Sequence, residues 1–396
     1  MNVSILDNDL YKFSMQQAVC SMFPRAEARY ELIWRRNIPT ITGKMLAGIG
    51  SRLNALEDTY LRKEEKRFLK TACPFLTPVY LDFLEGYRFD PKNEVEVDID
   101  KGNKGLKITV IGPWYRTILW EVPLLAMVSE IICMEQNDYE PPWGMEKTIS
   151  HAREKAEVLK NNKIKFADFG TRRRFSTEVH MKVTKAISEV AQDNFVGTSN
   201  LLLAKNLQLR PIGTQAHEWF MYHGATFGYR QATELALKHW SNVYHGDLGI
   251  ALTDTYTSDV FFDSFGTFYA KLFDGIRHDS GDAIVFTEKA IEHYKLLSID
   301  PTTKTIVFSD GLNVDDCIAI NRYCLGKIRC SFGIGTNLTN DCGANPLDVV
   351  MKMVACRDSG KDWLPTVKLS DIPGKNTGDE EEVKLCKKQL NINQLS

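Results

Sequence analysis

Apolar and polar positions follow a repeating order from about residue 164 to residue 338. Short apolar, β-prone stretches end in small or polar residues, and apolar residues at helical spacing follow most of them. Such strand-and-turn units cover residues 164–170, 194–199, 207–218, 249–256, 273–282, 305–313 and 328–338. Helical patterns separate several of them, at residues 176–192, 218–238, 283–297 and 314–325. Strands that alternate with helices predict an α/β protein with a parallel sheet.

The number of these units favours a closed or nearly closed (β/α) barrel, an irregular TIM-like fold with about seven strands. In such barrels the catalytic groups lie at the carboxyl ends of the strands. An open doubly wound sheet is the alternative, but it more often begins with a glycine-rich first turn. The chain has neither a GxGxxG nor a Walker A motif, so the sequence favours the barrel.

The first 150 residues follow a different pattern. Helical spacing at residues 9–22, 45–59 and 63–72 mixes with alternating, strand-like runs at residues 27–35, 94–100 and 106–111. We therefore predict an α+β cap domain over residues 1–150 and an α/β barrel catalytic domain over residues 151–345. Residues 346–396 are expected to form a C-terminal segment that returns to the cap domain, with a solvated charged run at residues 379–388.

Composition narrows the class of protein. Of the 396 residues 25% are charged and 43% are hydrophobic, and the formal net charge is −2. No overall charge therefore attracts nucleic acid or an anionic membrane, and we expect neither as a partner. The nine cysteines form no CxxC or Cys/His metal spacing, which favours reduced thiols and a cytoplasmic location.

Targeting and membrane signals point the same way. The start of the chain lacks the basic and apolar regions of a secretory signal. The most apolar stretch, residues 117–134, is interrupted by Glu121, Pro123 and Glu130. It therefore predicts a buried or interface helix, not a membrane span.

The stretch from Pro211 to Trp219 is the most informative single segment. A short apolar entry runs into Gly213 and Thr214, and His217 then begins a segment with helical apolar spacing. A helix start favours an anion, because its first backbone N–H groups are free and its dipole is positive there. His217 could therefore hold, or briefly carry, a phosphoryl group. Taken alone, such a histidine is more often a structural residue that bonds locally.

The predicted strand ends together collect acids, arginines and small residues. These are Phe169, the basic run 172–174, Thr198, Ser199, Asp254, Arg277, Asp279, Asp310, Gly335 and Thr336. Each alone has an ordinary explanation, as a turn residue or a solvated charge run. Acids suit Mg²⁺ and sugar hydroxyls, whereas arginine forks and glycine turns suit phosphates. The combination predicts a ligand that carries both phosphates and hydroxyls.

Several motifs resemble those of one known family. In order they are LDNDLYKFSMQQA, FADFGTRRR, GTSN, GTQAHEWFM, IALTDTY, DGIRHDSGD, FSDGLN, FGIGTNL and VKLSD with a following GK. Over essentially its full length the chain resembles the nicotinate phosphoribosyltransferases, which are type II phosphoribosyltransferases. The resemblance implies synthesis of nicotinate mononucleotide and diphosphate from nicotinate and 5-phosphoribosyl 1-diphosphate, as the first step of NAD synthesis from nicotinate. It also implies coupled hydrolysis of ATP to ADP and phosphate, Mg²⁺ as cofactor, and a homodimer with shared active sites in which the cap domain takes part.

At the nicotinate end, the resemblance assigns Arg277 to the pyridine carboxylate and Phe169 to stacking on the ring. Tyr11 is expected to stack from the partner subunit, and Thr198 and Ser199 to contact the substrate. Nicotinamide-using relatives carry an acid at the position of Ser199, where a carboxylate would repel that of nicotinate. A nicotinamide phosphoribosyltransferase is the alternative enzyme, and a catalytically silent metabolite-binding homologue is the alternative outside enzymes.

At the phosphate end, the resemblance makes His217 the histidine that ATP phosphorylates transiently. Asp254 and Asp279 match catalytic acids that hold the ribose and the Mg²⁺-bound diphosphate, and Arg172 matches a phosphate contact. The contacts to the 5′-phosphate and the nearby ribose fall on Asp310, Gly335 and Thr336. The nucleophile is the pyridine nitrogen, which is already basic, so the enzyme mainly positions the reactants and neutralises charge.

Overall fold

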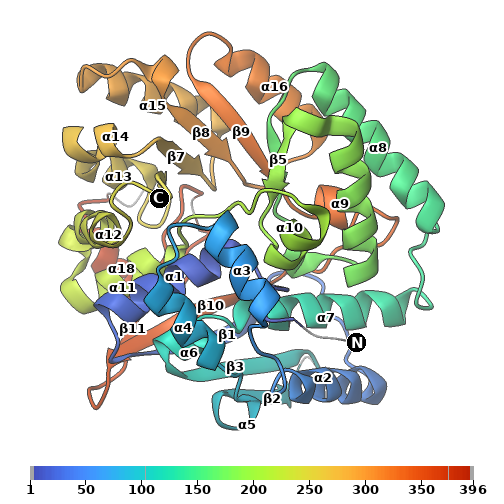
Figure 1. Ribbon diagram of the computed structural model, residues 1–396. Coiled ribbons are helices and arrows are strands. Elements are labelled where there is room, and N and C mark those ends of the chain that lie inside the picture. The colour runs from blue at the N-terminus through green and yellow to red at the C-terminus, as the bar shows by residue number, and fades with distance from the viewer. Residues whose placement is uncertain (1–3, 103, 373, 393–396) are drawn as a thin grey trace.

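The chain combines a parallel α/β sheet with an N-terminal domain built on an antiparallel sheet (Figure 1). The computed structural model describes residues 4–102, 104–372 and 374–392. The N-terminal segment that we predicted not to be a secretory signal therefore has its first three residues outside the described ranges. The parallel sheet has the strand order β5-β4-β9-β8-β7-β6. Its strands are β4 Phe166–Asp168, β5 Phe195–Thr198, β6 Ile250–Leu252, β7 Gly275–His278, β8 Thr305–Phe308 and β9 Arg329–Ile334. The predicted α/β class is confirmed.

The third predicted strand, at residues 207–212, does not form a regular strand. Pro211 makes one isolated parallel bridge with Thr198, because proline has no N–H to give to a β-ladder. The segment still contacts both edge strands of the sheet. Ile212 N–H donates to the Thr198 carbonyl of β5 at 2.9 Å, and Gln215 Oε1 accepts from Leu252 N–H of β6 at 3.2 Å. It therefore lies between β5 and β6, where a barrel needs a seventh strand.

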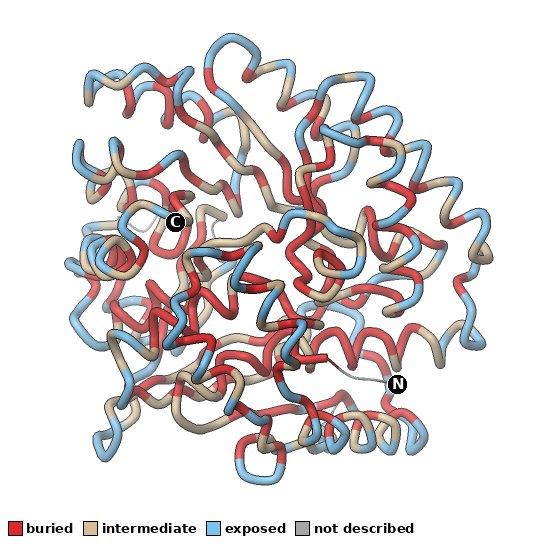
Figure 2. The backbone as a smooth tube through the Cα atoms, in the orientation of Figure 1, coloured by how far each residue is buried: buried red, intermediate tan, exposed pale blue. Residues whose placement is uncertain are grey.

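Amphipathic helices cover the outside of the parallel sheet, and their outward faces are exposed (Figures 1 and 2). They are α8 Met145–Asn161, α9 Thr177–Ala191, α10 Leu201–Leu207, α12 Tyr229–Tyr244, α13 Ser258–Ser264, α14 Thr267–Leu272, α15 Ala283–Leu296 and α16 Val314–Cys324. Two further helices, α11 His217–Phe227 and the short α17 Thr336–Thr339, are largely buried. The single helix predicted at residues 218–238 is two helices, because Gly228 adopts a positive φ of 87° between α11 and α12.

The N-terminal sheet contains a strand from the end of the chain. Its order is β11-β10-β1-β3-β2, with β1 Ala26–Trp34, β2 Val95–Ile99, β3 Leu106–Pro113, β10 Val349–Asp358 and β11 Leu364–Pro365. β10 pairs antiparallel with the whole of β1, from Ala26 opposite Asp358 to Trp34 opposite Val349. The domain boundaries near residues 150 and 345 stay predictions. The charged run at residues 379–388 belongs to a helix, α18 Glu380–Gln389, whose Glu382 accepts a hydrogen bond from Tyr229 of α12 at 2.7 Å.

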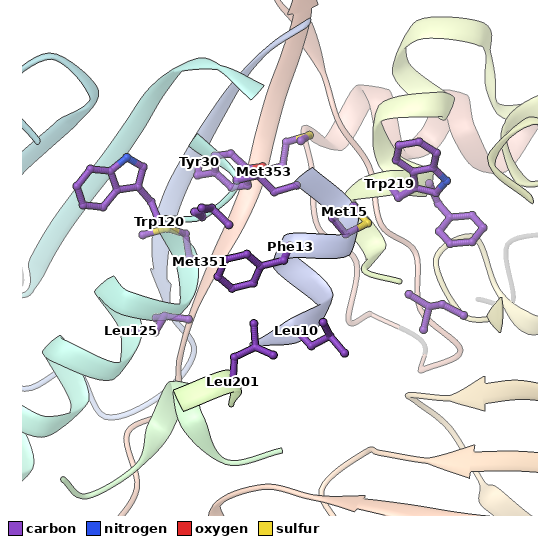
Figure 3. Close-up of a cluster of buried hydrophobic side chains, with 14 of the residues drawn as sticks. Leu10, Phe13, Met15, Tyr30, Trp120, Leu125, Leu201, Trp219, Met351 and Met353 are labelled. Atoms are coloured by element: carbon purple, nitrogen blue, oxygen red, sulfur yellow. The ribbon is translucent and has the colours of Figure 1, made fainter. Parts of the chain in front are cut away.

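One helix, α1 Leu10–Met22, lies at the centre of the molecule. Figure 3 shows its Leu10, Phe13 and Met15 among Trp120 and Met351 of the N-terminal domain and Leu201 and Trp219 of the α/β part. The other N-terminal helices are α2 Gly43–Ala55, α3 Lys63–Ala72, α4 Pro78–Gly86, α5 Pro91–Glu94, α6 Trp114–Thr117 and α7 Glu121–Gln136. Because α1 is buried on nearly every side, both parts of the molecule share one core.

The apolar stretch around α7 is a core segment. Among the described residues, Trp114–Gln136 is the one helical stretch long and apolar enough to cross a membrane, judged by length and composition. Within it, 83% of the most apolar window is buried inside the protein. This agrees with the predicted buried helix, since a helix that is apolar on all sides packs inside a large core.

Candidate active site

His217 is the first residue of α11, at the end of the irregular segment that lies between β5 and β6. The N-cap position holds Ala216, which offers no side-chain cap. The Trp219 N–H donates to the Ala216 carbonyl at 3.1 Å, so the first turn of the helix lacks the side-chain acceptor that a capping residue would supply. Gly213 permits the preceding turn, because a Cβ there would lie 2.8 Å from the backbone nitrogen of Tyr11. The sequence thus places an imidazole at an anion-favouring helix start.

Both ring nitrogens of His217 face charged or polar partners. Nε2 lies 2.9 Å from Asp279 Oδ2 and 3.0 Å from the Lys368 ammonium. Nδ1 lies 3.2 Å from Thr255 Oγ1 and 3.6 Å from Asp254 Oδ1. The side chain keeps 21% of its surface exposed. The predicted residues His217, Asp254 and Asp279 therefore come together although they lie on three different elements.

Charge and burial favour a neutral His217. Burial, and next the ammonium of Lys368, lower the pKa of His217 below its ordinary value, although Asp254 and Asp279 act in the opposite direction. Burial also disfavours ionised Asp279, but Arg277 and His217 outweigh it and hold the pKa of Asp279 well below its usual range. A neutral imidazole beside ionised carboxylates has a lone pair for a nucleophilic step.

The acids at this site also offer a place for a cation. Ligand atoms of His217, Asp254 and Asp279 all lie within 4.8 Å of one another. Asp254 is fully buried, and its Oδ2 accepts from Ser280 Oγ at 2.7 Å and pairs with Lys368 at 3.0 Å. Its Oδ1 has no hydrogen-bond partner within the described protein. A buried carboxylate oxygen without a partner fits a divalent cation or a sugar hydroxyl.

Phe169 and Arg277 are the two residues predicted to bind the nicotinate ring. The Phe169 ring lies against Gly333, where a Cβ would be only 2.3 Å from the ring carbons. Arg277 donates from Nη1 to the Gln215 carbonyl at 3.4 Å and lies 3.7 Å from Asp279. Its Nε is buried and has no acceptor within the described protein. Arg277 therefore keeps a donor for a further acceptor.

Tyr11 and Arg172 meet at one carboxylate, that of Glu121. Arg172 Nη1 donates to Glu121 Oε1 at 3.0 Å, and Tyr11 Oη donates to Glu121 Oε2 at 3.3 Å. All three residues belong to the same chain. The expected stacking of Tyr11 in the site of a partner subunit stays a prediction.

Thr198 and Ser199 are engaged within the protein. Thr198 Oγ1 donates to Asp168 Oδ2 at 2.7 Å, and Ser199 Oγ donates to Asp9 Oδ1 at 2.8 Å. Both side chains are buried. Their hydroxyl protons therefore hold the turn after β5 against neighbouring elements, and direct contact with a substrate stays a prediction.

The predicted 5′-phosphate residues follow β8 and β9. Burial raises the pKa of Asp310 above its ordinary value, and Asp279 adds to the shift although Lys375 opposes it. Gly335 precedes the short helix α17, and Thr336 is its first residue. Their assignment to the 5′-phosphate also stays a prediction.

Lys368 is the main site residue that the sequence reasoning missed. It contacts His217 and Asp254, and it reaches them from a segment that follows β11. Lys352 and Lys375 lie near it. Burial, and then Arg35, Lys368 and Lys375, lower the pKa of Lys352 to about 8. The motif VKLSD with its following GK contained the signal, because it places Lys368 and Lys375 close together in the chain.

Comparison with known proteins gives one consistent result. The model of the nicotinate phosphoribosyltransferase (NAPRTase) family matches residues 164–394, and that of the NAPRTase N-terminal domain matches residues 6–129. The chain is 50% identical over 388 residues to the nicotinate phosphoribosyltransferase of Desulforapulum autotrophicum and 49% identical over 392 residues to that of Chromohalobacter salexigens. Each alignment covers 98% of both proteins. The crystal structure of nicotinate phosphoribosyltransferase from Porphyromonas gingivalis matches with a TM-score of 0.95 and 44% identity, covering 99% of this chain and 100% of that one.

Proposed function

The chain belongs to the nicotinate phosphoribosyltransferase family, whose enzymes make nicotinate mononucleotide for NAD synthesis, and we propose that it couples this reaction to ATP through a phosphoryl group carried on His217. The observation that carries the proposal is the setting of this imidazole. It begins a helix and lies between the Lys368 ammonium and two carboxylates, and burial and Lys368 lower its pKa. The same family membership favours this function over the two alternatives, a nicotinamide phosphoribosyltransferase and a catalytically silent homologue.

The phosphoryl step follows from that setting. A ring nitrogen with a free lone pair attacks the γ-phosphorus of ATP, so that a P–N bond forms while the P–O bond to ADP breaks. Lys368 and the positive end of the helix dipole at the start of α11 stabilise the added negative charge. Water then attacks the phosphorus, which returns the neutral imidazole and releases inorganic phosphate.

Asp254 and Asp279 are proposed to hold Mg²⁺ with the diphosphate of the phosphoribosyl donor. The unpartnered Oδ1 of Asp254 fits such a cation, and oxygen donors are those that Mg²⁺ prefers. When bound, Mg²⁺ neutralises charge on the departing diphosphate. The carboxylates themselves stabilise positive charge that develops at C1 of the ribose as the bond to diphosphate breaks.

Arg277 and Phe169 are proposed to bind nicotinate. The unpartnered Nε of Arg277 supports pairing with the pyridine carboxylate, because a buried donor gains most from a charged acceptor. Phe169 supplies an aromatic face for the ring. We also propose the homodimer with shared sites, in which Tyr11 serves the partner, and phosphate contacts at Arg172, Asp310, Gly335 and Thr336.

Labelling tests the role of His217. The protein is incubated with Mg²⁺ and ATP labelled at the γ-phosphate, and protein-bound phosphate is measured for its lability in acid. We expect acid-labile label on the wild type and none on His217→Ala. A matched variant, His245→Ala, changes an exposed histidine at the end of α12 and should label like the wild type. Label that persists in His217→Ala would refute the assignment.

A further inference from the structure

A buried ion network connects the residue after His217 with Arg172. The Lys12 ammonium of α1 pairs with Glu218 Oε1 at 2.6 Å and with Glu121 Oε2 at 2.5 Å. The other oxygen of Glu121 accepts from Arg172 at 3.0 Å. Glu218 stands in the first turn of α11, directly after His217. The charges thus alternate in an unbroken line from the start of α11 to Arg172.

Lys12 lies in the core that α1 shares with both parts of the molecule. Its side chain is completely buried, and those of Glu218 and Glu121 are 6% and 10% exposed. Figure 3 shows α1 between Trp120 and Trp219, the residues adjacent in sequence to Glu121 and Glu218. Apolar residues of similar volume usually stabilise such a position as well as an ion pair does, because buried charges lose their hydration. Packing alone therefore gives little reason for a lysine here.

Neighbouring carboxylates nevertheless stabilise the ammonium form of Lys12. Burial alone would lower the pKa of Lys12, but Glu121 and Glu218 outweigh it and raise the pKa above its ordinary value. Among the described residues Lys12 is the one cation paired with Glu218. Any change of charge beside Glu218 is therefore felt by Lys12, and through Lys12 by Glu121.

We propose that Lys12 is a positioning residue that couples the phosphorylation of His217 to the placement of Arg172 and Tyr11, an inference that rests on the proposed phosphohistidine. A phosphoryl group on His217 adds about 1.5 to 2 negative charges one residue from Glu218. The added charge draws Lys12 towards α11 and weakens its bond to Glu121. Glu121 then holds Arg172 and Tyr11 more firmly, and Arg172 keeps its remaining N–H groups for a phosphate.

Coupling is reciprocal by thermodynamic linkage. If phosphorylation orders Arg172, then a substrate bound at Arg172 must stabilise the phosphorylated state by the same factor. Without Lys12 the two ends lose their connection. ATP would then be hydrolysed whether or not substrates are converted, so the number of phosphates released per nicotinate mononucleotide formed would rise.

The test compares a double variant at Lys12 and Glu218 with a control variant at another buried lysine. Lys12→Met/Glu218→Gln removes one charge of each sign, so the remaining pair of Glu121 and Arg172 stays balanced. Lys304→Met is the control: Lys304 is also buried, and its ammonium donates to the Phe273 carbonyl at 2.7 Å at the amino ends of the strands, away from the site. Phosphate release and product formation are measured together at saturating nicotinate and phosphoribosyl donor, so weaker substrate binding does not affect the ratio.

We expect the double variant to melt cooperatively and to incorporate label from ATP, with a phosphate-to-product ratio at least fivefold above the wild type. Lys304→Met should keep the wild-type ratio. A ratio within twofold of the wild type in the folded double variant would overturn the role of Lys12 and leave the phosphohistidine standing. Absence of label from the wild type would instead refute the proposed function. If the double variant does not melt cooperatively, Glu218→Gln alone decides by the same ratio.

Discussion

Replacing Gly333 by alanine should displace Phe169 and weaken nicotinate binding. The new Cβ would lie 2.3 Å from two ring carbons of Phe169, whereas carbon atoms in contact prefer about 3.5–4.0 Å. The ring must therefore move by more than about 1 Å. The backbone of β9 cannot yield instead, because it is paired with β4 on one side and β8 on the other. The Phe169 side chain therefore moves, and the β9 backbone stays in place.

The size of the kinetic effect follows from this displacement. A misplacement of about 1 Å at a substrate-positioning group can cost up to about 100-fold in rate. We expect the KM for nicotinate in Gly333→Ala to rise at least about tenfold, about 1.4 kcal/mol of lost binding. The KM for the phosphoribosyl donor should stay within about twofold of the wild type, because Phe169 is assigned only to the pyridine ring. Steady-state formation of nicotinate mononucleotide, with each substrate varied in turn, measures both constants.

A second glycine provides the control. In Gly48→Ala of α2 the new Cβ would lie 3.7 Å from Ile131, an ordinary contact, so this variant should keep wild-type kinetics and gain some helix stability. An unchanged KM for nicotinate in a folded Gly333→Ala protein would show that Phe169 does not contact the ring. An equal rise of both KM values would point to general distortion of the site.

Three further predictions follow from the same structure. Arg277→Ala should raise the KM for nicotinate at least about tenfold more than the KM for the phosphoribosyl donor, measured in the same steady-state assay. Chelation with EDTA should abolish product formation and added Mg²⁺ should restore it, with little change in Tm, because Lys368 already pairs with Asp254. Asp7→Asn should lower the free energy of unfolding by about 2 kcal/mol at pH 7, measured with urea, because Arg174 outweighs the effect of burial and lowers the pKa of Asp7 from 3.8 to about 2. The wild-type contribution is present above about pH 4 and is lost as the pH falls towards 2, so the two proteins should become equally stable in acid.

Local sequence patterns predicted the helices and strands whose formation depends mainly on the periodic burial of apolar residues. Nine of the ten predicted strands and most predicted helices lie within a few residues of their expected places, because apolar periodicity reports which face of an element is buried. The pattern failed at Pro211, whose missing N–H prevents a regular strand, and at Gly228, whose positive φ ends α11. Most charged side chains of the tail are exposed, as predicted, but the pattern did not indicate that the tail forms a helix, α18, which buries Val383 and Cys386.

The site was predictable only where it follows from strand ends. His217, Asp254 and Asp279 were expected together because the carboxyl ends of parallel strands meet at one edge, and their ligand atoms do lie within 4.8 Å. Lys368 was not, because it enters from a segment beyond the sheet, held where Leu369 N–H donates to the Thr255 carbonyl at 2.8 Å. Lys12 was missed because a lysine in a helical pattern suggests a solvated face. No local signal reveals pairings between residues so distant along the chain.

Among the candidate residues at the strand ends, the hydrogen bonds of each polar atom distinguish residues that hold the fold from residues that keep an atom for a ligand. Thr198 and Ser199 share the strand-end position of Asp254, but both hydroxyls donate to carboxylates of the protein. Asp254 Oδ1 and Arg277 Nε have no such partner. A buried polar atom left unsatisfied costs about 1–3 kcal/mol, and a folded protein tolerates that cost most readily where a bound substrate or ion removes it. Position at a strand end therefore identifies candidate site residues. The hydrogen bonds that each polar atom makes within the protein then show which candidates keep an atom for a ligand. On this criterion Asp254 and Arg277 are the residues whose substitution should affect catalysis before it affects folding.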